Sequence, residues 1–85
     1  MKKVLVVDDD QYIRDVYREL LEGEKYQVET AVDRQEGLLK TQEGGFDLIL
    51  LDVMDRAMRN GAKSYLIKSE MNPDQFLQNI KKFLG

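Results

Sequence analysis

Short apolar runs alternate with segments of helical periodicity along the chain, and this alternation constrains the fold more than any other feature. Residues 4–7 form a continuous apolar run rich in valine, and residues 47–51 are apolar throughout except for the first, Asp47. Continuous apolar runs of this length are typical of strands buried on both faces of a parallel sheet. Residues 27–31 and 65–67 are predicted to be two further strands. The pattern therefore predicts four β-α units and a parallel sheet covered by helices.

Helical segments follow the predicted strands and carry recognisable start and stop signals. Asp10 is expected to cap the first helix, and Gly23 is its expected stop. Asp33 and Glu36 resemble a capping box, which predicts a second helix that begins at Arg34. The other predicted helices are a short one at 54–60 and a last one after Asn72-Pro73, with Phe76, Leu77, Ile80, Phe83 and Leu84 on its inner face.

The length of 85 residues predicts one domain, spanning residues 1–85. Hydrophobic residues make up 42% and charged residues 34%, a balance typical of a globular chain and unlike that of a disordered one. The net charge of −3 provides no positive field that would attract nucleic acid or anionic lipid. Neither is therefore expected as a partner.

The chain contains neither cysteine nor histidine. Disulfides, thiolate metal sites, histidine-dependent catalytic triads, histidine-ligated zinc and a phosphohistidine carrier are thereby excluded. The apolar run after Met1-Lys2-Lys3 is far shorter than the core of a signal peptide, and no segment is long enough to span a membrane. We therefore expect a cytoplasmic protein.

Charged side chains follow three of the predicted strands directly. Asp8 and Asp9 follow the first strand, Asp52 follows the third, and Lys68 follows the fourth. In a parallel sheet these positions lie at one edge, where ligands of α/β folds bind. Clustered carboxylates repel one another unless a cation or a proton neutralises them. Hard oxygen ligands without histidine or cysteine point to Mg²⁺.

Each of these residues also has a simpler interpretation when it is taken alone. Asp8 and Asp9 could be solvated loop acids, Asp52 could cap the next helix, and Lys68 could be a surface cation. The hypothesis of a site rests on their conjunction, because all four follow apolar strands at the same edge.

Three segments carry a specific resemblance to the receiver domains of two-component response regulators. They are Val-Leu-Val-Val-Asp-Asp-Asp at 4–10, Phe-Asp-Leu-Ile-Leu-Leu-Asp-Val-Met at 46–54, and Gly-Ala-Lys-Ser-Tyr-Leu-Ile-Lys at 61–68. The resemblance implies a flavodoxin-like fold. In the third segment it implies that Lys68 contacts the phosphoryl group and that Tyr65 is the aromatic residue that changes rotamer in signalling.

The resemblance also implies the role of the carboxylates. Asp52 would be the phosphoacceptor, and a histidine kinase or a small phosphodonor would be the partner. Asp8 and Asp9 would hold Mg²⁺ together with Asp52 and the backbone carbonyl of Met54. An enzyme acting on a separate substrate is not expected, because the chain has no Gly-rich loop after the first strand and no Walker pattern.

One departure from the family pattern is large. Only residues 53–67 lie between Asp52 and Lys68, which leaves room for one crossover. The resemblance therefore implies that the family's third helix and fourth strand are deleted here, together with the hydroxyl residue that ends that strand. Ser69 also stands where the family has a proline.

The deletion leads to a specific expectation for the sheet. Removing one strand from the family order 2-1-3-4-5 predicts four parallel strands in the order 2-1-3-4, with helices on both faces. The last strand should move beside strand 47–51, because unpaired buried backbone groups cost about 1–3 kcal/mol each. This shift would bring Lys68 closer to Asp52 by one strand spacing, roughly 4.8 Å. We expect a monomer or, if the short 53–63 connection is strained, a strand-exchanged dimer.

Two functions remain open from the sequence. The first is a phosphoacceptor signalling module whose signalling is impaired by the deletion. The second is a minimal α/β scaffold, natural or engineered, that keeps the fold without signalling activity. The lost hydroxyl residue favours impaired switching, but it leaves metal binding plausible.

Overall fold

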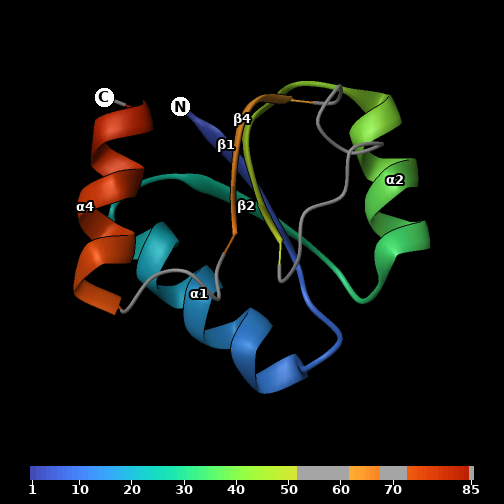
Figure 1. Ribbon diagram of the computed structural model, residues 1–85, viewed down its shortest axis with the longest axis horizontal. Coiled ribbons are helices and arrows are strands. Elements are labelled where there is room, and N and C mark those ends of the chain that lie inside the picture. Colours follow the sequence, from blue (N-terminus) through green and yellow to red (C-terminus); the bar gives the residue numbers. More distant parts are fainter. Residues whose placement is uncertain (52–61, 68–72, 85) are drawn as a thin grey trace.

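A parallel sheet forms the centre of the molecule in a computed structural model that describes residues 1–51, 62–67 and 73–84 (Figure 1). Within these ranges the sheet has four strands in the order β2-β1-β3-β4. All three pairs of neighbouring strands are parallel. The elements along the chain are β1 Lys3–Val7, α1 Gln11–Gly23, β2 Gln27–Ala31, α2 Arg34–Glu43, β3 Phe46–Leu51, β4 Ala62–Ile67 and α4 Pro73–Leu84.

The predicted strand order is confirmed, and so is the place of the last strand. β4 pairs directly with β3, from Phe46 opposite Ala62 to Leu51 opposite Ile67. β3 is buried along nearly its whole length, so its backbone groups need partners on both sides. β1 supplies the partner on one side and β4 the partner on the other.

The last strand begins earlier than the sequence predicted. β4 starts at Ala62 instead of Tyr65, because pairing with β3 extends to the start of that strand. The added residues Ala62, Lys63 and Ser64 carry no apolar run, so nothing local marks them as strand. The short helix predicted at 54–60 lies outside the described residues.

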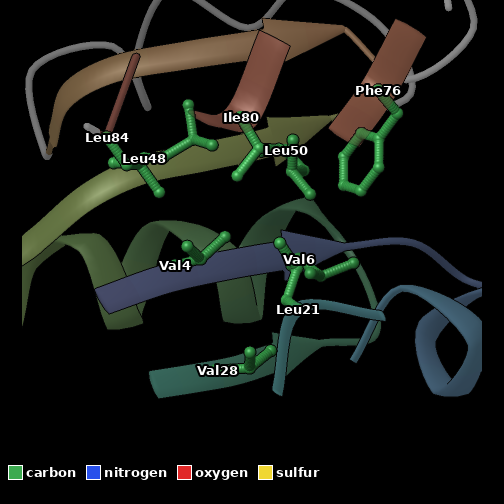
Figure 2. Packing of buried hydrophobic residues seen from close by; sticks show 9 residues of the cluster. All are labelled: Val4, Val6, Leu21, Val28, Leu48, Leu50, Phe76, Ile80 and Leu84. Carbon is green, nitrogen blue, oxygen red and sulfur yellow. The ribbon is translucent and has the colours of Figure 1, made fainter. Parts of the chain in front are cut away.

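Helices cover the two faces of the sheet, as predicted. In Figure 1, α1 and α4 lie on one face and α2 lies on the other. Among the described residues, two hydrophobic clusters correspond to these faces. The first cluster, shown in Figure 2, comprises Val4, Val6, Leu21, Val28, Leu48, Leu50, Phe76, Ile80 and Leu84. The second comprises Leu5, Val7, Ala31, Phe46, Ile49 and Leu51, with Leu38 of α2 packed against it.

Direct contacts join α1 to α4 on their shared face. The rings of Tyr17 and Phe76 meet edge to face, with centroids 4.5 Å apart. Lys81 of α4 also forms an ion pair with Glu24 at 3.6 Å. Phe76 is fully buried, so the ring contact contributes more than the exposed ion pair.

No helix in the described part of the chain is both long enough and apolar enough to cross a bilayer.

Candidate functional site

The three aspartates after β1 form a tight turn that leads into α1, and we call residues 8–10 the acidic loop. Asp8 is only 6% exposed. Its backbone N–H donates to the carbonyl of Ala31, at the end of β2, over 3.1 Å. Its carboxylate Oδ1 accepts a hydrogen bond of 2.8 Å from the backbone N–H of Asp10. Asp8 is therefore held at the carboxyl end of the strands and is not a solvated loop residue.

The other two aspartates have different roles. The carboxylate of Asp10 accepts from the backbone N–H of Tyr12 at 2.8 Å and caps α1, as predicted. Asp9 is exposed at the carboxyl end of β1. The side chain of Asp9 is thus accessible to a ligand from solvent.

The third and fourth strands end beside each other at the same edge. Leu51 and Ile67 are register partners in the β3–β4 pair. Asp52 and Lys68, the next residues along the chain, lie outside the described residues, as does Met54. Tyr65 lies in β4 opposite Ile49, and only its backbone is described. The structure therefore places the strands that lead to the predicted site, and two of its acids.

The acidic loop provides donors that suit a magnesium ion. Carboxylate and carbonyl oxygens are the ligands that Mg²⁺ prefers, and they usually hold it together with water. Within the described ranges, no group of three or more Asp, Glu, His or Cys side chains could hold a metal. The carboxylates of Asp8 and Asp9 are oxygen ligands of the kind that such an ion takes.

Arg14 is a residue of this region that the sequence analysis missed. Its Nη1 donates a hydrogen bond of 2.6 Å to the backbone carbonyl of Asp8. Arg14 is the fourth residue of α1, where the positive end of the helix dipole disfavours a cation. That mismatch between charge and position, four residues after an acidic run, was the signal that could have revealed Arg14.

Comparison with known proteins identifies the family. Residues 4–55 match the model of the response regulator receiver domain. This chain belongs to the receiver-domain family. The match ends at residue 55, close to the point where the sequence departs from the family pattern.

Curated relatives match part of this receiver domain. The transcriptional regulatory protein ResD of Bacillus subtilis is 46% identical over 52 residues, which cover 61% of this chain and 22% of that protein. The alkaline phosphatase synthesis transcriptional regulatory protein PhoP of the same organism is 47% identical over 53 residues, which cover 62% of this chain and 22% of that protein. The chain thus spans less than a quarter of the length of either relative.

Solved structures resemble nearly the whole receiver domain. The chemotaxis protein CheY4 of Vibrio cholerae has a TM-score of 0.75 and 28% identity, over 98% of both chains. The response regulator TrrA of Thermotoga maritima, solved in complex with Mg²⁺–BeF, has a TM-score of 0.74 and 28% identity, over 98% of this chain and 99% of that one. TrrA has also been solved in complex with the histidine kinase ThkA, and that match has a TM-score of 0.74 and covers 100% of both chains. The expected flavodoxin-like fold is therefore confirmed.

Proposed function

We propose that this receiver domain is a phosphoacceptor module of two-component signalling in which Asp52 accepts the phosphoryl group and signalling is impaired by the internal deletion. The observation that carries the proposal is the convergence of three strand ends at one edge. β1 ends in the acidic loop beside β3, and β3 ends at Leu51 beside Ile67 of β4. Asp52 and Lys68 are the residues that directly follow those two strands.

The chemistry follows from the residue types. A carboxylate oxygen of Asp52 would attack the phosphorus of the donor, forming the new P–O bond while the bond to the donor's leaving group breaks. Asp8, Asp9, Asp52 and the carbonyl of Met54 would hold Mg²⁺, which when bound offsets negative charge on the phosphoryl oxygens. The ammonium of Lys68 would add a second positive charge at the same edge. The chain itself is modified, so no turnover of a separate substrate is proposed.

A histidine kinase or a small phosphodonor is the proposed source of the phosphoryl group. The kinase complex of TrrA, a structural relative, supports the first of these partners. We propose no nucleic acid or membrane partner, since the net charge is −3. A monomer, in which β3 and β4 of one chain pair, is the proposed state, and a strand-exchanged dimer is the alternative. A cytoplasmic location remains part of the proposal.

We propose that switching is impaired because the coupling between the phosphoacceptor and the signalling surface has lost a residue. The resemblance implies a hydroxyl residue that ends the family's fourth strand and works with the aromatic position, here Tyr65. β3 and β4 are direct neighbours, which supports the absence of a strand between them. Without that hydroxyl residue, phosphorylation of Asp52 would have no partner through which to shift Tyr65.

Intact-mass measurement after incubation with acetyl phosphate tests the phosphoacceptor proposal. We expect slow, Mg²⁺-dependent addition of one phosphoryl group in the parent chain and none in Asp52→Asn. The tyrosine fluorescence and circular dichroism of the modified chain should match those of the unmodified one. A complete lack of modification would favour the alternative, a minimal scaffold. Efficient modification with a spectral change across the domain would contradict impaired switching.

A further inference from the structure

We propose that Arg14 is a positioning residue of the acidic loop: its guanidinium fixes the peptide unit before Asp9 and so holds the Asp9 carboxylate in place for a divalent cation. The inference rests on the proposed function, which gives Asp9 a role in holding Mg²⁺. In this proposal Arg14, a residue of α1, touches neither the metal nor the phosphoryl group and acts through the backbone of the acidic loop.

Hydrogen bonds hold both peptide units that flank Asp9. The unit before it is held at the carbonyl of Asp8, which accepts from Nη1 of Arg14 over 2.6 Å. The unit after it is held at the N–H of Asp10, which donates to Oδ1 of Asp8 over 2.8 Å. Because rotation of these two units sets the direction of the Cα–Cβ bond of Asp9, the exposed carboxylate starts from a fixed backbone.

The groups that hold the loop are themselves anchored. Asp8 is buried, and its N–H donates to the carbonyl of Ala31 in β2 over 3.1 Å. The backbone N–H of Arg14 donates to the carbonyl of Asp10 over 3.0 Å, which is the first hydrogen bond of α1. The side chain of Arg14 thus reaches back from an ordered helix to a loop tied to the sheet, and links the two.

Helix stability alone does not account for an arginine at this position. A cation near the N-terminus of a helix is disfavoured, and the acid at this end of α1 is its cap Asp10, which belongs to the acidic loop and not to the first turn of the helix. The charge-assisted hydrogen bond to the carbonyl of Asp8 offsets this cost, because such bonds are shorter and stronger than neutral ones. The favourable contact of Arg14 is therefore with the loop.

Positioning and simple electrostatics predict opposite effects on metal binding. If Arg14 acted only as a nearby positive charge, its removal would strengthen Mg²⁺ binding, because repulsion between the two cations would disappear. If Arg14 positions the loop, its removal weakens Mg²⁺ binding, because the carboxylate of Asp9 then has to be ordered when the ion binds. The sign of the change separates the two roles.

The experiment measures Mg²⁺ dissociation constants of the full chain by titration calorimetry for the parent, Arg14→Met, Arg14→Lys and a matched control. The control is Arg18→Met, which removes an exposed arginine of the same helix that pairs only loosely with Glu22, at 3.8 Å. We expect Kd to rise roughly tenfold in Arg14→Met, the lower range for loss of an outer-shell partner. The Kd of Arg14→Lys should lie between those of the parent and Arg14→Met, and the Kd of Arg18→Met should equal that of the parent.

Amide hydrogen exchange without metal supplies a second measurement that does not depend on metal binding. We expect exchange at the N–H of Asp10 to accelerate in Arg14→Met and in Arg14→Lys, while amides of β1 keep the parent rate. This comparison separates a local loosening of the loop from general destabilisation, and Arg14→Lys provides it if Arg14→Met does not fold.

The outcomes distinguish the two proposals. A parent that binds Mg²⁺ with Arg14→Met binding equally or more tightly overturns the positioning role and leaves the proposed metal site intact. Unchanged exchange at Asp10 also overturns that role. A parent that binds no Mg²⁺ overturns the metal site and, with it, the role assigned to Arg14.

Discussion

Leu51 and Ile67 are register partners at the ends of two neighbouring parallel strands. The residues that follow them are the proposed phosphoacceptor Asp52 and the lysine Lys68. In the strand order that the family resemblance implies, another strand separates these two positions. The direct pairing of β3 with β4 therefore removes that separation between the two strand ends.

We predict that Lys68→Met destabilises the metal-free protein more than removal of a surface lysine does. An ammonium at the end of β4 would neutralise carboxylates at the adjacent strand ends when no metal is bound. The free energy of unfolding, measured with urea, should fall by clearly more than about 0.5 kcal/mol, the usual limit for surface substitutions. Lys82→Met on the exposed side of α4 is the control. Equal effects of the two substitutions would refute a role for Lys68 in charge compensation.

Magnesium should stabilise the parent chain, and Asp9→Asn should abolish that effect. Binding to the folded state alone adds about 1.4 kcal/mol when the Mg²⁺ concentration is about ten times Kd. For a domain of this size that corresponds to a rise in Tm of roughly 5–10 °C. Without metal, Asp9→Asn should melt at a higher temperature than the parent, because it removes one of the repelling charges. A thermal melt that responds equally to Mg²⁺ in both proteins would exclude Asp9 as a ligand.

Phe76→Ala should cost about 3–5 kcal/mol of unfolding free energy, the usual loss for a buried phenylalanine. Phe76 is fully buried between α4 and the sheet (Figure 2), and its ring meets that of Tyr17 of α1. A loss of that size is a large part of the total stability of a small domain. Phe76→Leu, which keeps most of the apolar volume, should cost much less. Similar denaturation midpoints for Phe76→Ala and the parent would show that the α1–α4 interface adds little.

Lys40→Met should promote self-association through the outer edge of β2. The backbone groups of Gln27 and Ala31 form hydrogen bonds on the β1 side of β2. Because successive residues of a strand direct their backbone groups to opposite sides, the carbonyl of Thr30 faces the outer edge. Nζ of Lys40 donates to that carbonyl, and an edge covered in this way resists pairing with another strand. Sedimentation velocity should detect dimers or larger species of Lys40→Met at concentrations where the parent and Lys82→Met are monomeric. A monomeric Lys40→Met would show that the lysine does not protect the edge.

Local signals predicted most of the elements because each depends on neighbouring residues. Apolar runs marked the buried strands, and the cap residues Asp10 and Asp33 were correctly placed at the starts of α1 and α2. α2 ends at Glu43, and the cap residue Gly44 adopts the positive φ of 80° that glycine tolerates. The start of β4 was not predicted, because Ala62, Lys63 and Ser64 are strand only through their pairing with β3.

The face by which α2 packs was also not evident from hydrophobicity. Its buried residues are Gly37 and Thr41, whereas Leu39 is exposed. Small residues let a helix approach a sheet closely, but they carry no apolar periodicity that a sequence pattern could reveal. Two small residues and the single apolar contact of Leu38 therefore mark the inner face of this helix.

The sequence by itself determined that the chain forms alternating strands and helices, and that Asp8, Asp9, Asp52 and Lys68 follow strands at one edge of the sheet. These properties depend on residues that are close together in the chain. Tertiary structure decided the rest, because it depends on contacts between distant residues. Burial of both sides of β3 requires β4 as its neighbour, and the hydrogen bond from the N–H of Asp8 to the carbonyl of Ala31 ties the acidic loop to β2.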